Sequence, residues 1–144
     1  MGYSLGFTQA IALMVRIGAM IEIKKYEYVS TRDLARDLNI PRPTVVQLIG
    51  KLTAAGLLET KEGQKGGVRL ILKPETINLK HILEAIELNK PLFRMDLNIN
   101  INNPLVDIVR KKVSENLKQV EQAMKRQLEK ISLEMLFAYG SDNN

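Results

Sequence analysis

The chain has 144 residues and 45% hydrophobic content, which suits one domain, or a small domain with an extension, around a buried core. It contains no cysteine and a single histidine, His81, which excludes disulfides, thiolate zinc sites and cysteine-ligated iron–sulfur clusters. We therefore expect no cofactor and no metal.

Residues 1–80 contain 12 Lys/Arg and 7 Asp/Glu, so they carry the whole net charge of +5, while residues 81–144 are neutral. This asymmetry is typical of an anion-binding module joined to a neutral one. Charge alone, however, fits a basic surface that binds no anion equally well.

No membrane span or signal peptide is expected. The longest apolar stretch, residues 10–23, is interrupted by Arg16 and Glu22, and it is shorter than the roughly 20 residues that cross a bilayer. No basic segment precedes this stretch, as a signal peptide requires. We expect a cytoplasmic protein.

Three helices are predicted in the first part of the chain. They cover residues 4–25, a short segment from Ser30 to about Asn39, and a segment that begins at Pro41 and stops near Gly56. In the third helix, apolar residues at i, i+3, i+4 and i+7 predict one buried face. These residues are Val45, Leu48, Ile49 and Leu52.

A hairpin and a fourth helix follow. Residues 57–61 and 68–72 are predicted strands, and the segment 62–67 between them supplies three glycines for the turn. Asn78 begins the fourth helix. Residues 88–103 are predicted to form a linker or loop.

From Pro104 to about Ser132 the chain is predicted to form one long helix with a narrow apolar stripe. Such a stripe, flanked by Lys, Glu and Gln, favours packing against a partner chain over packing on its own small domain. The predicted dimer interface consists of Val106, Val109, Val113, Leu117, Val120 and Met124.

The order of these elements predicts a mainly α fold with a small β-hairpin wing. The fold class is a winged helix-turn-helix followed by a long C-terminal dimerisation helix. We divide the chain into a DNA-binding domain (1–87), a linker or loop (88–103), and a dimerisation helix with a C-terminal tail (104–144).

The third helix and the wing carry the candidate DNA contacts. Arg42 suits guanine, Gln47 suits adenine, and Thr44 suits a base edge or a thymine methyl group, whereas Lys51 lies farther along the helix and suits a phosphate. Pro43 lies on the same predicted outer face. The wing adds three cations, which suit phosphates or the minor groove. These are Lys61, Lys65 and Arg69.

Five segments carry a recognisable pattern: STRDLA at 30–35, LTAAGLL at 52–58, GQKGGVRL at 63–70, INLKHILEAIE at 77–87 and KISLEML at 130–136. Together they resemble the Rrf2 family of bacterial transcription regulators over nearly the whole chain. The resemblance implies a homodimer in which the long helix crosses to the partner subunit and two winged domains bind a palindromic site.

Three departures from the family are visible. Many members hold a cluster with three cysteines between the fourth helix and the long helix, and residues 88–104 contain none. Cluster sensing and thiol oxidation sensing are therefore not expected. Pro41 stands where the family usually has a capping serine, and His81 stands where it tends to have an acid. We expect His81 to be structural.

We therefore predict a sequence-specific DNA-binding regulator, most simply a repressor, acting as a homodimer on double-stranded DNA. It either responds to a small-molecule effector bound near the linker and the long helix or has no effector. The alternative is a winged-helix module that binds other proteins and does not read DNA. An enzyme is not expected, because the sequence contains no recognisable catalytic arrangement.

Overall fold

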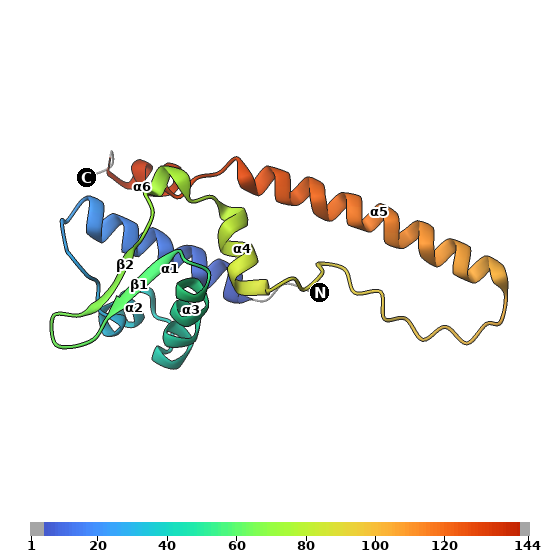
Figure 1. Cartoon of the computed structure of the whole chain (residues 1–144), viewed down its shortest axis with the longest axis horizontal. Helices are drawn as coiled ribbons and strands as arrows, with labels where there is room; N and C mark the ends of the chain where they lie inside the picture. Colours follow the sequence, from blue (N-terminus) through green and yellow to red (C-terminus); the bar gives the residue numbers. More distant parts are fainter. Residues whose placement is uncertain (1–4, 142–144) are drawn as a thin grey trace.

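The computed structural model describes residues 5–141, and side-chain surroundings through residue 137. The observed fold confirms the predicted class, since a helical domain carries one antiparallel hairpin and a long helix projects from it (Figure 1). Residues 1–4 and 142–144 of the predicted domains lie outside the described residues. The elements are α1 (Leu5–Glu22), α2 (Thr31–Leu38), α3 (Arg42–Ala54), β1 (Leu58–Lys61), β2 (Gly67–Leu70), a 3-10 turn η1 (Pro74–Thr76), α4 (Leu79–Glu87), α5 (Pro104–Glu129) and α6 (Leu133–Ser141).

Helix α1 forms the centre of the core. Its residues at three- and four-residue spacing point inward, and Leu13, Met14 and Ile17 are fully buried. Helices α2, α3, α4 and α6 and strand β2 pack around it, which explains why this segment of the chain is so apolar. Although no membrane span was expected from the sequence, α1 is long and apolar enough to cross a membrane by length and composition alone. In this fold its inward face is part of the core.

The turn between α2 and α3 sets the position of α3. The Ser30 hydroxyl accepts a hydrogen bond from the Asp33 N–H at 3.1 Å and so caps α2. Asn39 ends α2 in the left-handed conformation (φ 52°), which short polar side chains tolerate. Pro41 then precedes α3 without any side-chain cap. Four buried side chains of α3 hold it against the core, as the sequence predicts: Val45, Leu48, Ile49 and Leu52.

The wing is a two-stranded antiparallel hairpin in which Leu58 pairs with Leu70 and Glu59 with Arg69. Val29 adds one bridge on the outer side of β2 through two hydrogen bonds of 2.9 Å to Val68. Gly67 makes this close approach feasible, because a Cβ atom there would meet the Val29 carbonyl oxygen at 2.3 Å.

The predicted second strand, residues 68–72, extends two residues beyond the end of the observed strand, which begins one residue earlier, at Gly67. The observed strand ends at Leu70, while Ile71 and Leu72 are exposed and follow an irregular path toward η1. Both residues are apolar and continue the strand-like composition, so composition alone did not reveal the end of the pairing.

Residues 88–103 run outward from α4 without regular secondary structure, and helix α5 returns alongside them to the domain, so that the two segments form a projecting arm (Figure 1). None of the residues of α5 is buried. At its C-terminal end the arm is fixed to α4, because the Lys80 ammonium donates a hydrogen bond of 2.7 Å to the Glu129 carboxylate. Backbone hydrogen bonds from Leu79 to Ile131 and from Leu133 to Ile77 reinforce this junction.

Residues 133–141 differ from the C-terminal tail that the sequence led us to expect. They form helix α6, which returns to the domain and buries Leu133 and Phe137 against α1. Gly18 of α1 provides the space for the Phe137 ring, since a Cβ atom at that position would lie 2.9 Å from it. The C-terminal segment therefore contributes to the core of the winged domain as well as extending it.

Candidate nucleic-acid interface

The surface of α3 that faces away from the core carries small, uncharged side chains along its middle. Pro43, Gln47, Gly50 and Ala54 are exposed and recur at steps of four, three and four residues, so they form one strip along the helix. Small side chains at Gly50 and Ala54 let a ligand approach the helix backbone closely. A Cβ atom on Gly50 would have nothing within 4 Å.

The two cations of α3 lie on opposite flanks of this strip. Arg42 and Lys51 are nine residues apart, which corresponds to about two and a half helical turns. Arg42 is exposed, whereas Lys51 and Thr44 are half-buried. The predicted contacts of α3 therefore do not form one face: Arg42 lies on one side, Thr44 and Lys51 lie on the other, and Pro43 and Gln47 lie between them.

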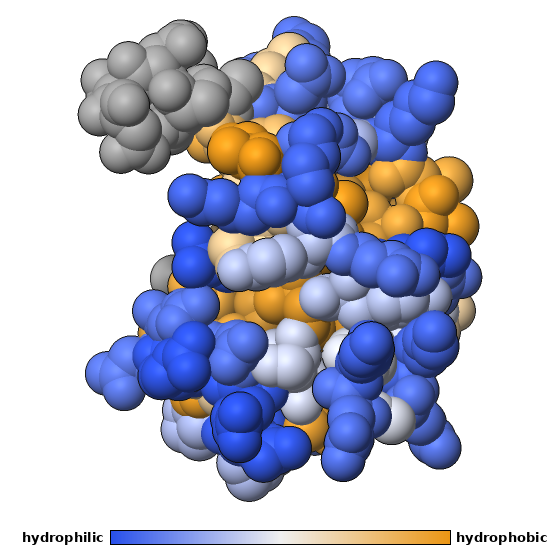
Figure 2. Space-filling view, turned by 90° about the vertical axis from the view of Figure 1, so that its left-hand side faces the viewer, coloured by the Kyte–Doolittle hydropathy of each residue, from blue (hydrophilic) through white to orange (hydrophobic). Residues whose placement is uncertain are grey.

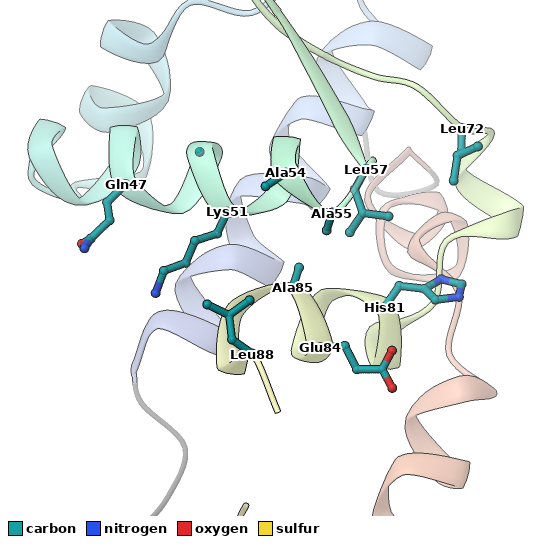
Figure 3. Close-up of a pocket in the computed structure, with 11 residues that line it drawn as sticks. Gln47, Lys51, Ala54, Ala55, Leu57, Leu72, His81, Glu84, Ala85 and Leu88 are labelled. Atoms are coloured by element: carbon teal, nitrogen blue, oxygen red, sulfur yellow. The ribbon is translucent and has the colours of Figure 1, made fainter. Parts of the chain in front are cut away.

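Gln47 and Lys51 border a groove of about 640 Å³ between α3 and α4. Figure 3 shows both side chains extending from α3 on the side of Leu88, the residue that directly follows α4. The floor is apolar and includes Ala85 and Leu57. A side chain placed in this way reaches nucleic acid only when the duplex lies against that flank of α3.

The wing carries its cations in two different settings. Lys65, in the turn between the strands, is exposed and makes no ion pair in residues 5–137. Arg69, in contrast, forms an ion pair with Glu59 on the paired strand, and its guanidinium lies 4.8 Å from the centroid of the Tyr28 ring. The hydrogen bond from Arg69 to Glu59 raises the pKa of Arg69 above its ordinary value. The ammonium of Lys61 lies 5.5 Å from the same ring centroid.

Tyr28 and Val46 are two surface residues that the sequence analysis missed. Tyr28 precedes α2, and the bridge between Val29 and Val68 brings its ring beside the hairpin. Val46 is 54% exposed on the flank of α3 that also carries Arg42. An apolar residue on the exposed side of a candidate recognition helix was a signal available in the sequence, whereas the position of Tyr28 depends on tertiary pairing.

His81 has a structural role. Its Nδ1 atom accepts a hydrogen bond from the Asn78 N–H at 3.2 Å, and the Asn78 side-chain oxygen accepts one from the His81 N–H at 3.0 Å. This reciprocal pair caps the beginning of α4.

The predicted dimer residues of α5 lie along one side of the arm. Val109, Val113 and Val120 are 58%, 42% and 52% exposed, and the other members of the set are half-buried. Leu105 and Ile108, which were not in the predicted set, are also exposed and widen the apolar surface near the tip of the arm. Contiguous apolar surface of this kind marks interaction sites.

Two curated bacterial proteins illustrate what the sequence is similar to. The HTH-type transcriptional regulator IscR of Cereibacter sphaeroides is 38% identical over 61 residues, which are 42% of this chain and 39% of the relative. The HTH-type transcriptional regulator NsrR of Shouchella clausii is 31% identical over 83 residues, which are 56% of each protein. The chain thus matches about half the length of these relatives.

Solved structures share the fold over almost the entire chain. The structure of T. potens IscR has a TM-score of 0.69 and 21% identity, and the match covers 100% of this chain and 91% of that one. CymR, described as the global cysteine regulator of B. subtilis, has a TM-score of 0.69 and 19% identity over 96% of this chain and 98% of its own. These similarities confirm the winged-helix architecture with a long C-terminal helix.

A family model for Rrf2, described as an iron-dependent transcriptional regulator, matches residues 6–139. The donor groups of this chain do not fit an iron centre or an iron–sulfur cluster, because it has no cysteine and one histidine, whose Nδ1 is already used in capping α4. Within the described part of the chain, no three His, Asp or Glu side chains are grouped as metal ligands. The chain belongs to the Rrf2 family, and it does so without the ligands that an iron–sulfur cluster requires.

Proposed function

We propose that this protein is a sequence-specific DNA-binding transcription regulator of the bacterial cytoplasm. The observation that carries the proposal is the combination of an α3 surface free of core contacts with a basic wing beside it. Figure 1 shows α2, α3 and the hairpin on the same lower side of the domain, away from α6. The family and the named relatives, which are transcriptional regulators and not enzymes, support the same function.

In the proposed complex, α3 enters the major groove. Arg42 and Gln47 read base edges, and the neutral strip at Gly50 and Ala54 lets the helix lie close to the groove floor. Lys51 and Thr44 meet the phosphate backbone on the flank next to α4. Lys61 and Lys65 extend the contact along the wing, and Arg69 supports the wing through Glu59 and Tyr28.

We further propose that the protein acts as a homodimer through α5. The exposed stripe on the arm supports this arrangement, because a long apolar helix face that is open to solvent is stabilised by a facing helix. Two winged domains related by a twofold axis would bind a palindromic operator with half-sites about 10 base pairs apart. Repression is the simplest outcome of such binding.

The test is fluorescence anisotropy with a duplex from the region upstream of the protein's own gene and with a shuffled duplex of equal composition. Tighter binding to the native duplex, with affinity that falls steeply with salt, supports sequence-specific readout. Equal binding to both duplexes would contradict specific reading of that site. Absence of binding at low salt to a panel of genomic fragments would favour the alternative, a winged-helix module that contacts other proteins.

A further inference from the structure

A second cavity, of about 730 Å³, lies between α1 and α6. Its size falls within the range of sites that enclose small organic ligands. The walls are mainly apolar and come from three helices: Ala12, Val15 and Ala19 of α1, Leu38 of α2, and Leu136 and Phe137 of α6. Figure 2 shows the face that lies on the left-hand side of Figure 1, where hydrophobic residues are exposed mainly in the upper half and the lower half is largely hydrophilic.

Two cations, Arg16 of α1 and Lys24 just beyond its end, border this apolar space. Within the described residues no acid forms an ion pair with Lys24. The Nε atom of Arg16 is buried and has no hydrogen-bond partner among the described groups. An unsatisfied buried donor is costly, and a carboxylate oxygen is the acceptor that a guanidinium prefers. The cavity therefore combines an apolar body with a cationic edge.

Arg16 also connects the cavity to the helix-turn-helix. Its Nη2 atom donates a hydrogen bond of 3.1 Å to Asp37 at the end of α2, and Asp37 receives a second one, of 3.2 Å, from Arg36. These hydrogen bonds, the one from Arg16 first, lower the pKa of Asp37. An anion bound at Arg16 would compete with Asp37 for the same guanidinium. It would thereby alter the ion pair that joins α1 to α2.

We propose that this cavity binds a small amphipathic carboxylic acid, with its apolar part between α1 and α6 and its carboxylate at Arg16. Lys24, at the other end of the cationic edge, adds electrostatic attraction for the ligand's carboxylate. The site is separate from the α3 surface and from the linker beside α5, so ligand binding does not depend on the proposed function. Its consequence for DNA affinity, through Asp37 and α2, does rest on that function.

The test is isothermal titration calorimetry of the full chain, without DNA, with octanoate and with 1-octanol as the uncharged counterpart. We expect saturable binding of octanoate and at least about tenfold weaker binding of 1-octanol, because the alcohol lacks the charge-assisted hydrogen bond. Arg16→Met should weaken octanoate binding to the level of the alcohol. Arg36→Met is the matched control, since it also removes a partner of Asp37 but lies outside the cavity, and it should bind octanoate like the wild type.

A second variant separates loss of the site from loss of the fold. Ala19→Met fills the cavity with an apolar side chain, and we expect it to abolish octanoate binding while the melting temperature stays close to that of the wild type. Three results would overturn the proposal: no saturable octanoate binding, equal losses in Arg16→Met and Arg36→Met, or a change in oligomeric state of Ala19→Met by light scattering. The last result would identify the cavity as a contact between subunits.

Discussion

The Arg69 guanidinium lies between the ring of Tyr28, at 4.8 Å from its centroid, and the carboxylate of Glu59. Glu59 and Arg69 are paired positions on β1 and β2, so this contact joins the two strands on the exposed face of the wing. A phosphate that approached Arg69 would have to compete with Glu59. The geometry therefore separates a bracing cation, Arg69, from the exposed cation at the tip, Lys65.

The first prediction concerns this difference. Replacing Lys65 with Ala should weaken binding to all DNA sequences. It should also make the negative slope of log affinity against log salt shallower by about one unit. Arg69→Ala should leave that slope nearly unchanged, because the ion pair with Glu59 already neutralises the guanidinium. Salt titrations by anisotropy measure both slopes. Equal reductions in the two variants would show that Arg69 contacts a phosphate directly.

The second prediction concerns the two flanks of α3. Arg42→Ala should cost about 1–3 kcal/mol on the native duplex and relax the preference for it over the shuffled duplex. Lys51→Ala should weaken both duplexes by a similar factor, because its side chain borders the groove toward α4. Competition binding with the two duplexes gives the specificity ratio for each variant. A ratio that falls only in Lys51→Ala would assign base reading to the flank next to α4.

The sequence was sufficient to predict the helices of the winged domain and the apolar face of α3, because both depend on local periodicity. It also predicted the stripe on α5, whose repeat is visible without any partner. Helix α6 was missed because its identity depends on Phe137 docking against Gly18, a contact across more than a hundred residues of chain. The contacts of Tyr28 with Lys61 and Arg69 depend in the same way on the bridge from Val29 to Val68.

The division of Arg42, Thr44 and Lys51 between two flanks of α3 is already implied by their spacing in the sequence. Charge and polarity alone place these residues in one group, but positions nine residues apart on a helix point in opposite directions. The exposed strip at Pro43, Gln47, Gly50 and Ala54 follows from the same helical geometry, once the four buried residues of α3 fix its inner face.

The third prediction concerns the arm. Replacing Val113 and Val120 with Asp places two charges on the apolar stripe and should convert a dimer into a monomer, as measured by light scattering. The matched control replaces Lys111 and Gln122 with Asp, two exposed polar positions of α5 outside the stripe, and it should remain dimeric. A dimer that survives the double change at Val113 and Val120 would place the subunit interface elsewhere.

The fourth prediction uses the contact between Lys80 and Glu129, which fixes α5 to α4. The hydrogen bond from Lys80 lowers the pKa of Glu129, so the pair stabilises the fold fully above the ordinary pKa of a glutamate, about 4.3. This stabilisation is lost as the pH falls through the lowered pKa of the folded state. We therefore expect Glu129→Gln to melt at a slightly lower temperature than the wild type at neutral pH, and the difference to vanish in acid.

Thermal melts followed by circular dichroism from about pH 7 down to about pH 3 test this prediction. Glu115→Gln is the control, because Glu115 lies on the exposed side of the arm and forms no ion pair in the described part of the chain. A difference between Glu129→Gln and the wild type that stayed constant or widened toward acid pH would contradict the role of this pair.

The claim that α3 reads DNA has a direct test, because the chain has no cysteine and a single introduced thiol is unique. Gly50→Cys places that thiol on the exposed strip of α3, where a Cβ atom meets nothing within 4 Å, and an iron–EDTA cleavage reagent can then be attached to it. We predict that the bound conjugate cuts the native duplex at a localised position in each half-site, whereas the same reagent on Gln122→Cys of α5 does not. Cleavage from Gln122→Cys without cleavage from Gly50→Cys, while the conjugates still bind the duplex, would contradict the claim.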